Sequence, residues 1–266
     1  MIHSGERESA TDDPATTLFC RALERPARGT EGEVGPEEVG HLRAARVRPG
    51  DPIAITDGRG ARWSAELLAL ERRVARFRLV APLDDARSFP LDLLVPVAQR
   101  DRSLWLVEKA VELSVGRIVW VEWTRSRSVA DAGRSRGFME RAERRAIAAM
   151  KQSGGAWLPG LSPPEAPREA LARAASSSSG RWLADAAGEP ALDVVADTGE
   201  VERMTVVVGP EGGLTDPERD ACLDAGYRPV RLGTRTLRFE TAAIAMSALA
   251  VAALEDTAVR RRRSRS

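Results

Sequence analysis

Two glycine-bearing segments near the C-terminus constrain the fold of this chain more than any other feature. Residues 209–213 read Gly-Pro-Glu-Gly-Gly after the apolar run 204–208, and residues 232–242 read Leu-Gly-Thr-Arg-Thr-Leu-Arg-Phe-Glu-Thr-Ala after the run 228–232. Each run is typical of a buried strand, and each segment leads into a predicted helix. Loops at the carboxyl ends of neighbouring parallel strands share a crevice, which is where open α/β sheets bind ligands. The sequence therefore predicts a ligand site between these two loops.

Local signals define the helices that follow the loops. Thr215 and Glu218 form a predicted capping box, in which each side chain bonds to the backbone N–H of the other residue. Gly226 is the residue type favoured just past a helix C-terminus. Residues 240–254 are rich in alanine and predict a buried helix, whose nearly all-apolar stretch of thirteen residues from 242 to 254 is too short to span a membrane.

The rest of the chain divides into two predicted domains. Residues 16–82 alternate short apolar runs with turn signals, which favours a small β-barrel. Residues 90–258 alternate strands with helices, which is typical of a doubly wound parallel sheet. Tails at 1–15 and 259–266 are predicted to be disordered. Within the second domain we expect strands at 91–97, 117–121, 181–186 and 204–208. We expect one helix that ends at residue 113, two further helices at 134–152 and 168–175, and a proline-broken segment at 159–167.

Composition places the chain among ordinary soluble globular proteins, with 43% hydrophobic residues and a formal net charge of +1. This near-neutral total hides a segregation of charge. Acidic residues outnumber arginines in 1–42, whereas basic residues outnumber acidic ones in 43–80 and 125–151. Separate basic regions are expected of a protein that contacts a phosphate backbone. For 125–151 alone, a solvated helix face explains the pattern equally well.

The cysteines and histidines give no metal signature. Cys20 and Cys222 lie far apart, and His3 and His41 do not form a ligand pair, so no metal site is predicted. The polar, acidic N-terminus has no apolar leader segment, which favours a cytoplasmic protein with no membrane attachment.

The two glycine segments together resemble the knotted, SPOUT-class RNA methyltransferases. One glycine loop alone is explained equally well by a tight turn, but a tight turn does not require Leu-Arg-x-Glu-Thr-Ala after it. The combination is similar in particular to the ribosomal RNA small subunit methyltransferase E family, which methylates N3 of a uridine in small-subunit rRNA. Weaker matches extend the resemblance over about residues 17–255: 41–43, 48–51, 56–60, 109–115, 125–126, 152–154 and Pro159.

This resemblance implies a fold, a cofactor and partners. The implied fold is a C-terminal SPOUT-type parallel sheet with a trefoil knot, preceded by a PUA-like β-barrel that binds RNA. The implied partners are ribosomal RNA or the small ribosomal subunit and a second copy of the chain in a homodimer. S-adenosylmethionine would lie in the crevice, where glycine lets the backbone approach a ligand closely. The implied cofactor-binding residues are Val208, Gly209, Pro210, Glu211, Gly213, Leu232, Gly233 and Leu237, although Glu211 is also explained by ordering of the first loop.

The implied reaction needs help with a proton, because N3 of neutral uridine carries one and has no lone pair available. Arg238 is the candidate for binding the uracil oxygen and stabilising the negative charge that develops. Glu240 is a candidate general base, although a glutamate in the first turn of a helix also stabilises free N–H groups. The candidate RNA-binding residues are Arg43, Arg46, Arg125 and Gln152, and structural hydrogen bonding would equally explain Arg125 and Gln152.

Several positions depart from the family pattern, and they keep alternatives open. Trp123, Thr124, Lys151, Gly155 and Phe239 stand where the family has other residues. One alternative is a noncatalytic RNA-binding assembly factor with the same fold. Another is a SPOUT methyltransferase that acts on a different RNA site. A nucleotide enzyme that binds phosphate at the first loop is disfavoured, because the loop lacks the Gly-Lys-Ser/Thr ending of a P-loop.

Overall fold

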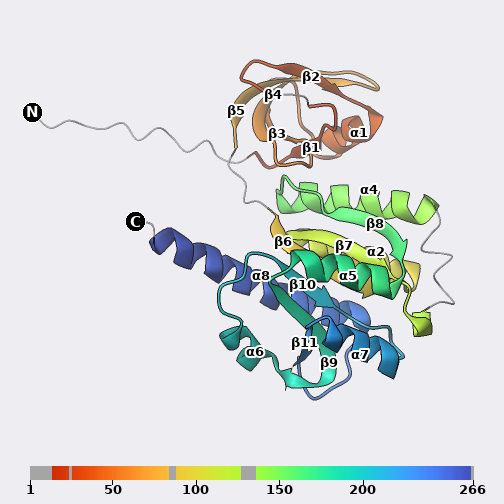
Figure 1. Cartoon of the computed structure of the whole chain (residues 1–266). Helices are drawn as coiled ribbons and strands as arrows, with labels where there is room; N and C mark the ends of the chain where they lie inside the picture. Colours follow the sequence, from red (N-terminus) through yellow and green to blue (C-terminus); the bar gives the residue numbers. More distant parts are fainter. Residues whose placement is uncertain (1–13, 24–25, 84–87, 127–135, 265–266) are drawn as a thin grey trace, which may run out of the picture. The chain divides into compact units, whose positions relative to one another are not determined.

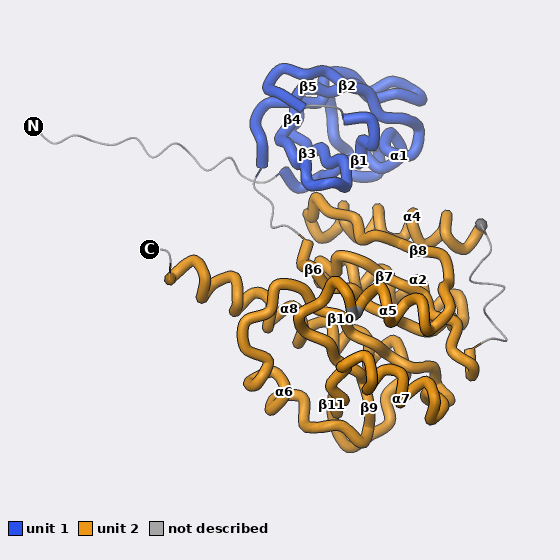
Figure 2. The backbone as a smooth tube through the Cα atoms, in the orientation of Figure 1, with its two compact units in different colours: residues 1–86 blue, residues 87–266 orange. Residues whose placement is uncertain are grey.

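A computed structural model describes residues 14–23, 26–83, 88–126 and 136–264. The chain forms two compact units, residues 1–86 and 87–266 (Figure 2). Most of the predicted N-terminal tail, and part of the predicted linker between the domains, lie outside the described residues.

The first unit is a five-stranded sheet with one helix. Its strands pair in the order β1-β3-β4-β5-β2; β1 and β3 are parallel and the other pairs antiparallel. In β5 the buried Ala75, Phe77 and Leu79 alternate with the exposed Arg76 and Arg78, so one strand supplies both the core and a basic outer face. The closed PUA-like barrel stays a prediction. The elements are β1 (Thr17–Phe19), β2 (Glu31–Val34), α1 (Pro36–Ala44), β3 (Pro52–Thr56), β4 (Arg62–Leu70) and β5 (Ala75–Pro82).

The second unit is an α/β fold with a parallel sheet, as predicted (Figure 1). Its six strands pair in the order β11-β9-β10-β6-β7-β8, and all of the pairs are parallel. The elements are β6 (Phe89–Pro96), α2 (Arg100–Glu112), β7 (Val115–Val121), η1 (Thr124–Ser126), α4 (Arg136–Ser153), β8 (Gly160–Glu165), α5 (Pro167–Ser177), β9 (Gly180–Pro190), α6 (Ala191–Asp197), β10 (Met204–Val207), α7 (Asp216–Asp224), β11 (Arg228–Arg231) and α8 (Phe239–Arg263).

Helices cover both faces of this sheet. On one face, α8 packs against β6, β10 and α2. On the other, Leu171 of α5 and Cys222 of α7 join Leu94, Val119 and Val207 of the strands in a buried cluster. Because the sheet is covered on both sides, its central strands β6, β7 and β10 are mostly apolar, which is why they were recognisable in the sequence.

Two strand predictions need correction. The strands β10 and β11, which precede the two glycine loops, are not neighbours, because β9 lies between them. The proline-broken segment 159–167 contains strand β8. Pro163 and Pro164 are tolerated there because β8 is at the edge of the sheet, where a missing N–H interrupts no second ladder.

The last helix is longer than the sequence suggested. It spans 25 residues, Phe239–Arg263, and is long and apolar enough to cross a membrane by length and composition alone. The expectation that it is too short to do so is therefore wrong. Its packing against the sheet and α2 accounts for the apolar residues as part of the core of this unit.

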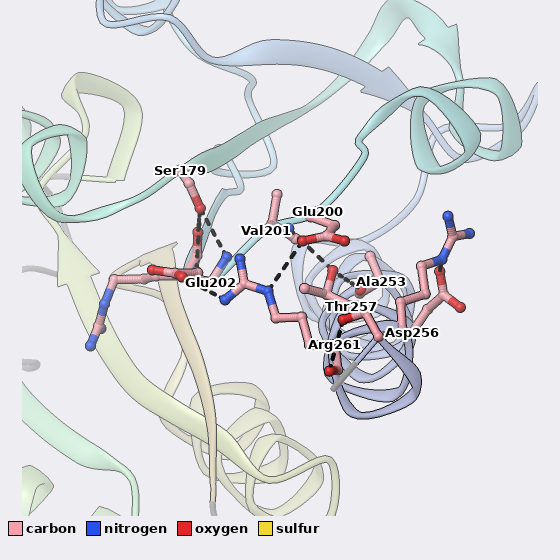
Figure 3. Close-up of polar contacts among 11 residues, drawn as sticks. Ser179, Glu200, Val201, Glu202, Ala253, Asp256, Thr257 and Arg261 are labelled. Atoms are coloured by element: carbon pink, nitrogen blue, oxygen red, sulfur yellow. Dashed lines mark hydrogen bonds and ion pairs between the residues drawn. The ribbon is translucent and has the colours of Figure 1, made fainter. Parts of the chain in front are cut away.

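Polar contacts explain why α8 continues past residue 258, where the sequence predicted a disordered tail (Figure 3). The Thr257 hydroxyl accepts a hydrogen bond from the Val201 N–H at 3.1 Å and donates one to a carbonyl of its own helix. Arg261, one turn further on, forms ion pairs with Glu200, at 3.2 Å, and with Glu202. These contacts tie the basic end of the helix to the segment before β10.

Candidate functional site

The residues predicted to bind a cofactor surround one cavity of about 340 Å³. It lies at the carboxyl ends of β10 and β11 and beside the middle of β9, at the edge where parallel sheets bind ligands. The structure brings all eight predicted residues together there: Val208, Gly209, Pro210, Glu211, Gly213, Leu232, Gly233 and Leu237.

Strand β9 contributes a third wall that the sequence reasoning missed. Residues 183–186 line the cavity between the two glycine loops, and the Asp185 carboxylate pairs with Arg219 of α7 at 2.6 Å. A signal was present, because Asp185 is near the end of the strand predicted at 181–186 and therefore at the same edge of the sheet. To place Asp185 between the two glycine loops, however, one must also know that β9 lies between β10 and β11 in the sheet.

The glycines have different structural roles. Gly213 has a φ of +73°, a conformation that favours glycine, and its N–H donates to the Pro210 carbonyl at 2.7 Å to close the turn. Gly233 is different, because a Cβ added there would meet no protein atom within 4 Å. The turn of the first glycine loop therefore requires glycine at 213, whereas the lack of a side chain at Gly233 leaves open space beside the cavity.

Arg125 holds the first glycine loop in place. Its guanidinium donates hydrogen bonds to the carbonyl oxygens of Gly212 and, at 3.3 Å, of Leu214. These are the structural hydrogen bonds that the sequence left open for this arginine, and its contact with RNA stays a prediction.

Glu218 anchors the other end of that loop. The predicted capping box at Thr215 is present. The same carboxylate accepts hydrogen bonds from the backbone N–H groups of Thr215, at 2.8 Å, and Thr124, at 2.7 Å. Burial acts to raise the pKa of Glu218, but the hydrogen bonds from Thr124 and Thr215 outweigh it and lower that pKa below its ordinary value. An ionised Glu218 thus links η1 to the start of α7.

The two candidate catalytic residues lie at the start of α8. Arg238 is the exposed N-cap residue, and it lies between Leu237 and Phe239, which both line the cavity. Glu240 is in the first turn and is only 8% exposed. Its Oε1 is 3.8 Å from Nε of Arg102, whose Nη1 is 3.1 Å from Oε1 of Glu211. Sequence reasoning did not single out Arg102, because nothing local marks this arginine of α2.

The remaining candidate RNA-binding residues are dispersed. Arg43 donates a hydrogen bond to the Glu71 carbonyl at 2.9 Å, and Arg46 is exposed with a φ of 60°. Gln152 lines a separate groove between α2 and α4, together with Arg141 and Arg144. None of these three candidates lines the cavity.

Three of the departures from the family pattern have structural roles. Trp123 is fully buried in the cluster formed by β7, α5 and α7. Thr124 donates its backbone N–H to Glu218. Phe239 is 3% exposed and forms part of the cavity wall. Phe239 therefore contributes to the cavity wall, Thr124 to the anchoring of the first glycine loop and Trp123 to the core.

Within the described ranges, no group of three or more His, Cys, Asp or Glu residues is arranged to hold a metal ion. Cys222 is buried in the core, and burial raises the pKa of its thiol to about 12. At neutral pH it is therefore protonated and behaves as a small apolar residue.

Comparison with known proteins decides the family. Residues 85–251 match the RNA methyltransferase domain family. Ribosomal RNA small subunit methyltransferase E of Mycobacterium bovis is 30% identical over 239 residues, which cover 85% of this chain and 88% of that protein. The chain belongs to the ribosomal RNA small subunit methyltransferase E family.

Other members extend this likeness to the whole fold. The methyltransferase E of Bacillus subtilis is 25% identical over 228 residues, which cover 80% of this chain and 87% of that protein. A crystal structure of the methyltransferase E of Neisseria gonorrhoeae, bound to S-adenosyl methionine, superposes with a TM-score of 0.77. It is 28% identical, and the match covers 88% of this chain and 95% of that one.

Proposed function

We propose that this chain is an S-adenosylmethionine-dependent RNA methyltransferase that methylates N3 of a uridine in small-subunit ribosomal RNA. Membership of the methyltransferase E family supports the reaction class and the cofactor. The observation that carries the proposal is the convergence of both glycine loops on one cavity. At about 340 Å³ its volume falls within the range of small-molecule sites.

The residues around the cavity fit this cofactor. The backbone of both glycine loops is accessible, so its N–H and C=O groups can read the edge of an adenine base. Apolar side chains from each wall, among them Val208, Leu232 and Leu237, suit the flat faces of the base. When bound, S-adenosylmethionine supplies an electrophilic methyl group, and the protein must bring the uridine nitrogen into line with it.

Arg238 and Glu240 have distinct proposed roles. Arg238 is exposed between two residues of the cavity wall, so its guanidinium can reach a uracil oxygen and stabilise the charge that develops on deprotonation. Glu240 is buried, and its Oε2 has no hydrogen-bond partner among the described residues. That oxygen is buried and Glu240 does not line the cavity, so its proposed role as acceptor of the N3 proton, directly or through water, requires the oxygen to become accessible when RNA is bound.

The proposed RNA contacts come from arginines of each unit, of which Arg46 and Arg144 are exposed and Arg141 is half-buried. Arg46 projects from the first unit, and Arg141 and Arg144 line the groove of the second with Gln152. These residues suit a phosphate backbone, since guanidinium groups bind phosphate oxygens in pairs. We further propose a homodimer, a trefoil knot, a PUA-like barrel and a cytoplasmic location, because the family resemblance implies the first three and ribosomal RNA is the substrate.

Single-turnover methylation tests the proposal. Small subunits that lack the modification are incubated with excess enzyme and methyl-labelled S-adenosylmethionine. Label should appear in a uridine of the RNA. Replacing Arg238 with alanine should leave cofactor affinity nearly unchanged and lower the rate by about a hundredfold, as expected for the loss of one donor aimed at developing charge. Raising the pH should partly restore the rate, because hydroxide then removes the N3 proton.

Two results would contradict these assignments. No transfer by the wild-type protein, despite binding of S-adenosylmethionine, would support a noncatalytic RNA-binding factor. A wild-type rate for Arg238→Ala at saturating RNA and cofactor would remove Arg238 from the reaction.

A further inference from the structure

Arg102 of α2 lies between two carboxylates, one in a wall of the cavity and one in the helical turn that follows the opposite wall. Its Nη1 is 3.1 Å from Oε1 of Glu211, in the first glycine loop. Its Nε is 3.8 Å from Oε1 of Glu240, in the first turn of α8. Glu211 lines the cavity and Arg102 does not. Glu240 does not line it either, so the arginine links the first glycine loop to the start of α8 from outside the cavity.

The environment of Glu240 makes this bridge important. The residue is 8% exposed, and burying an ionised carboxylate without a partner is costly. Among the described residues, Arg102 is the one cation found in an ion pair with it. The free N–H groups of the first helical turn also favour a negative charge at this position. Arg102 thus compensates Glu240 at the point where α8 begins.

The first glycine loop is held from two sides. Arg125 donates to the Gly212 and Leu214 carbonyl oxygens, and Arg102 pairs with the Glu211 side chain, which is 48% exposed. The other wall, which carries Leu237 and Phe239, continues directly into the turn that contains Glu240. A contact that joins Glu211 to Glu240 therefore fixes the distance between the two glycine segments.

We propose that Arg102 is a positioning residue, which holds the first glycine loop against the amino end of α8 and so sets the affinity of the cavity for S-adenosylmethionine. This inference rests on the proposed binding of that cofactor between the loops. Arginine suits the task because its planar group presents Nη1 to one carboxylate and Nε to the other. Lysine has a single charged nitrogen and maintains one contact at a time.

Calorimetric titration with S-adenosylmethionine tests the proposal directly. Arg102→Met removes both contacts and should weaken binding about tenfold, within the range of coupling found for residues in one ion-pair network. Arg102→Lys should weaken it less. The matched control is Arg100→Met, at an exposed position on the same helix for which no ion pair is found among the described residues, and it should bind as the wild type does.

A double-mutant cycle separates positioning from a general loss of structure. If Arg102 acts through Glu211, the double variant Arg102→Met/Glu211→Gln should bind about as weakly as Arg102→Met alone. Effects that multiply would overturn the proposal, as would wild-type affinity in a folded Arg102→Met. If Arg102→Met fails to fold, Arg102→Lys carries the test, because it keeps the charge and maintains only one of the two contacts at a time. Its affinity must fall severalfold, and an unchanged affinity overturns the inference.

Failure of the proposed function and failure of the inference about Arg102 give different results. Wild-type protein that binds no S-adenosylmethionine would overturn both the proposed function and this inference. Wild-type protein that binds the cofactor and methylates RNA, while Arg102→Met matches Arg100→Met, would overturn the inference alone.

Discussion

Gly233 offers the most discriminating test of where the cofactor binds. A Cβ added at this position would meet no protein atom within 4 Å, and its φ does not lie in the region that favours glycine. Gly233→Val should therefore fold normally, with a change in unfolding free energy of about 0.5 kcal/mol or less, as is usual for exposed sites. The new side chain would instead occupy space beside the cavity, where the cofactor is proposed to lie.

The other glycines of the site do not allow this separation. At Gly209 a Cβ would be 3.1 Å from the Leu214 side chain, and at Gly213 the positive φ itself would strain any other residue. Substitutions at either position would disturb the loop and the cavity together. Gly233 is thus the position at which a loss of affinity reports on the ligand alone.

The expected size of the effect follows from overpacking. Forcing extra methyl groups into a well-packed space costs about 1–3 kcal/mol. Since about 1.4 kcal/mol changes an equilibrium constant tenfold, the dissociation constant for S-adenosylmethionine should rise about 5- to 150-fold. Gly233→Ala should give a smaller loss. Isothermal titration calorimetry measures both, and Gly40→Val is the control, because that glycine of α1 is also exposed with open space around it.

Wild-type affinity in a correctly folded Gly233→Val would refute the reasoning. It would place the cofactor away from the second glycine loop. Reduced affinity in Gly40→Val as well would point to a general effect of the substitution.

Three further predictions concern the supports of the site and its RNA partner. Arg125→Ala should weaken S-adenosylmethionine binding about tenfold in calorimetry, because it removes charge-assisted hydrogen bonds to the loop; unchanged binding would show that the loop needs no such support. Because the folded-state pKa of Glu218 lies below its ordinary 4.5, its stabilisation is present above that pH and is lost as the pH falls. Urea unfolding below pH 4.5 should therefore show a flatter acid dependence for Glu218→Gln, and an identical dependence would contradict this. Replacing Arg141 and Arg144 with glutamine should reduce the slope of log RNA affinity against log salt by up to about 1.8; an unchanged slope would mean that neither contacts phosphate.

The sequence was sufficient for features with local causes. The capping box at Thr215, the glycine loops and the apolar central strands depend on residues close together in the chain, and those predictions agree with the structure. The contribution of Asp185 depended on strand order, which is non-local. Arg102 was missed for the same reason, because its partners are more than a hundred residues away.

Two errors came from judging segments without their surroundings. Pro163 and Pro164 suggested a break, but an edge strand tolerates them. The basic residues after 258 suggested a disordered tail. Arg261 instead forms ion pairs with Glu200 and Glu202, which precede β10, and the helix continues to Arg263. In both cases tertiary contacts outweighed the local preference.

The central claim is that this protein places a methyl group on N3 of a uridine in small-subunit ribosomal RNA. Mass-spectrometric mapping of the ribosomal RNA nucleosides tests it most directly, by comparing a strain that lacks the gene with one in which the gene is restored. We expect one 3-methyluridine in the small-subunit RNA to disappear in the deletion strain and to return with the wild-type gene, but not with the Arg238→Ala variant. An unchanged set of methylated uridines in the small-subunit RNA of the deletion strain would contradict it.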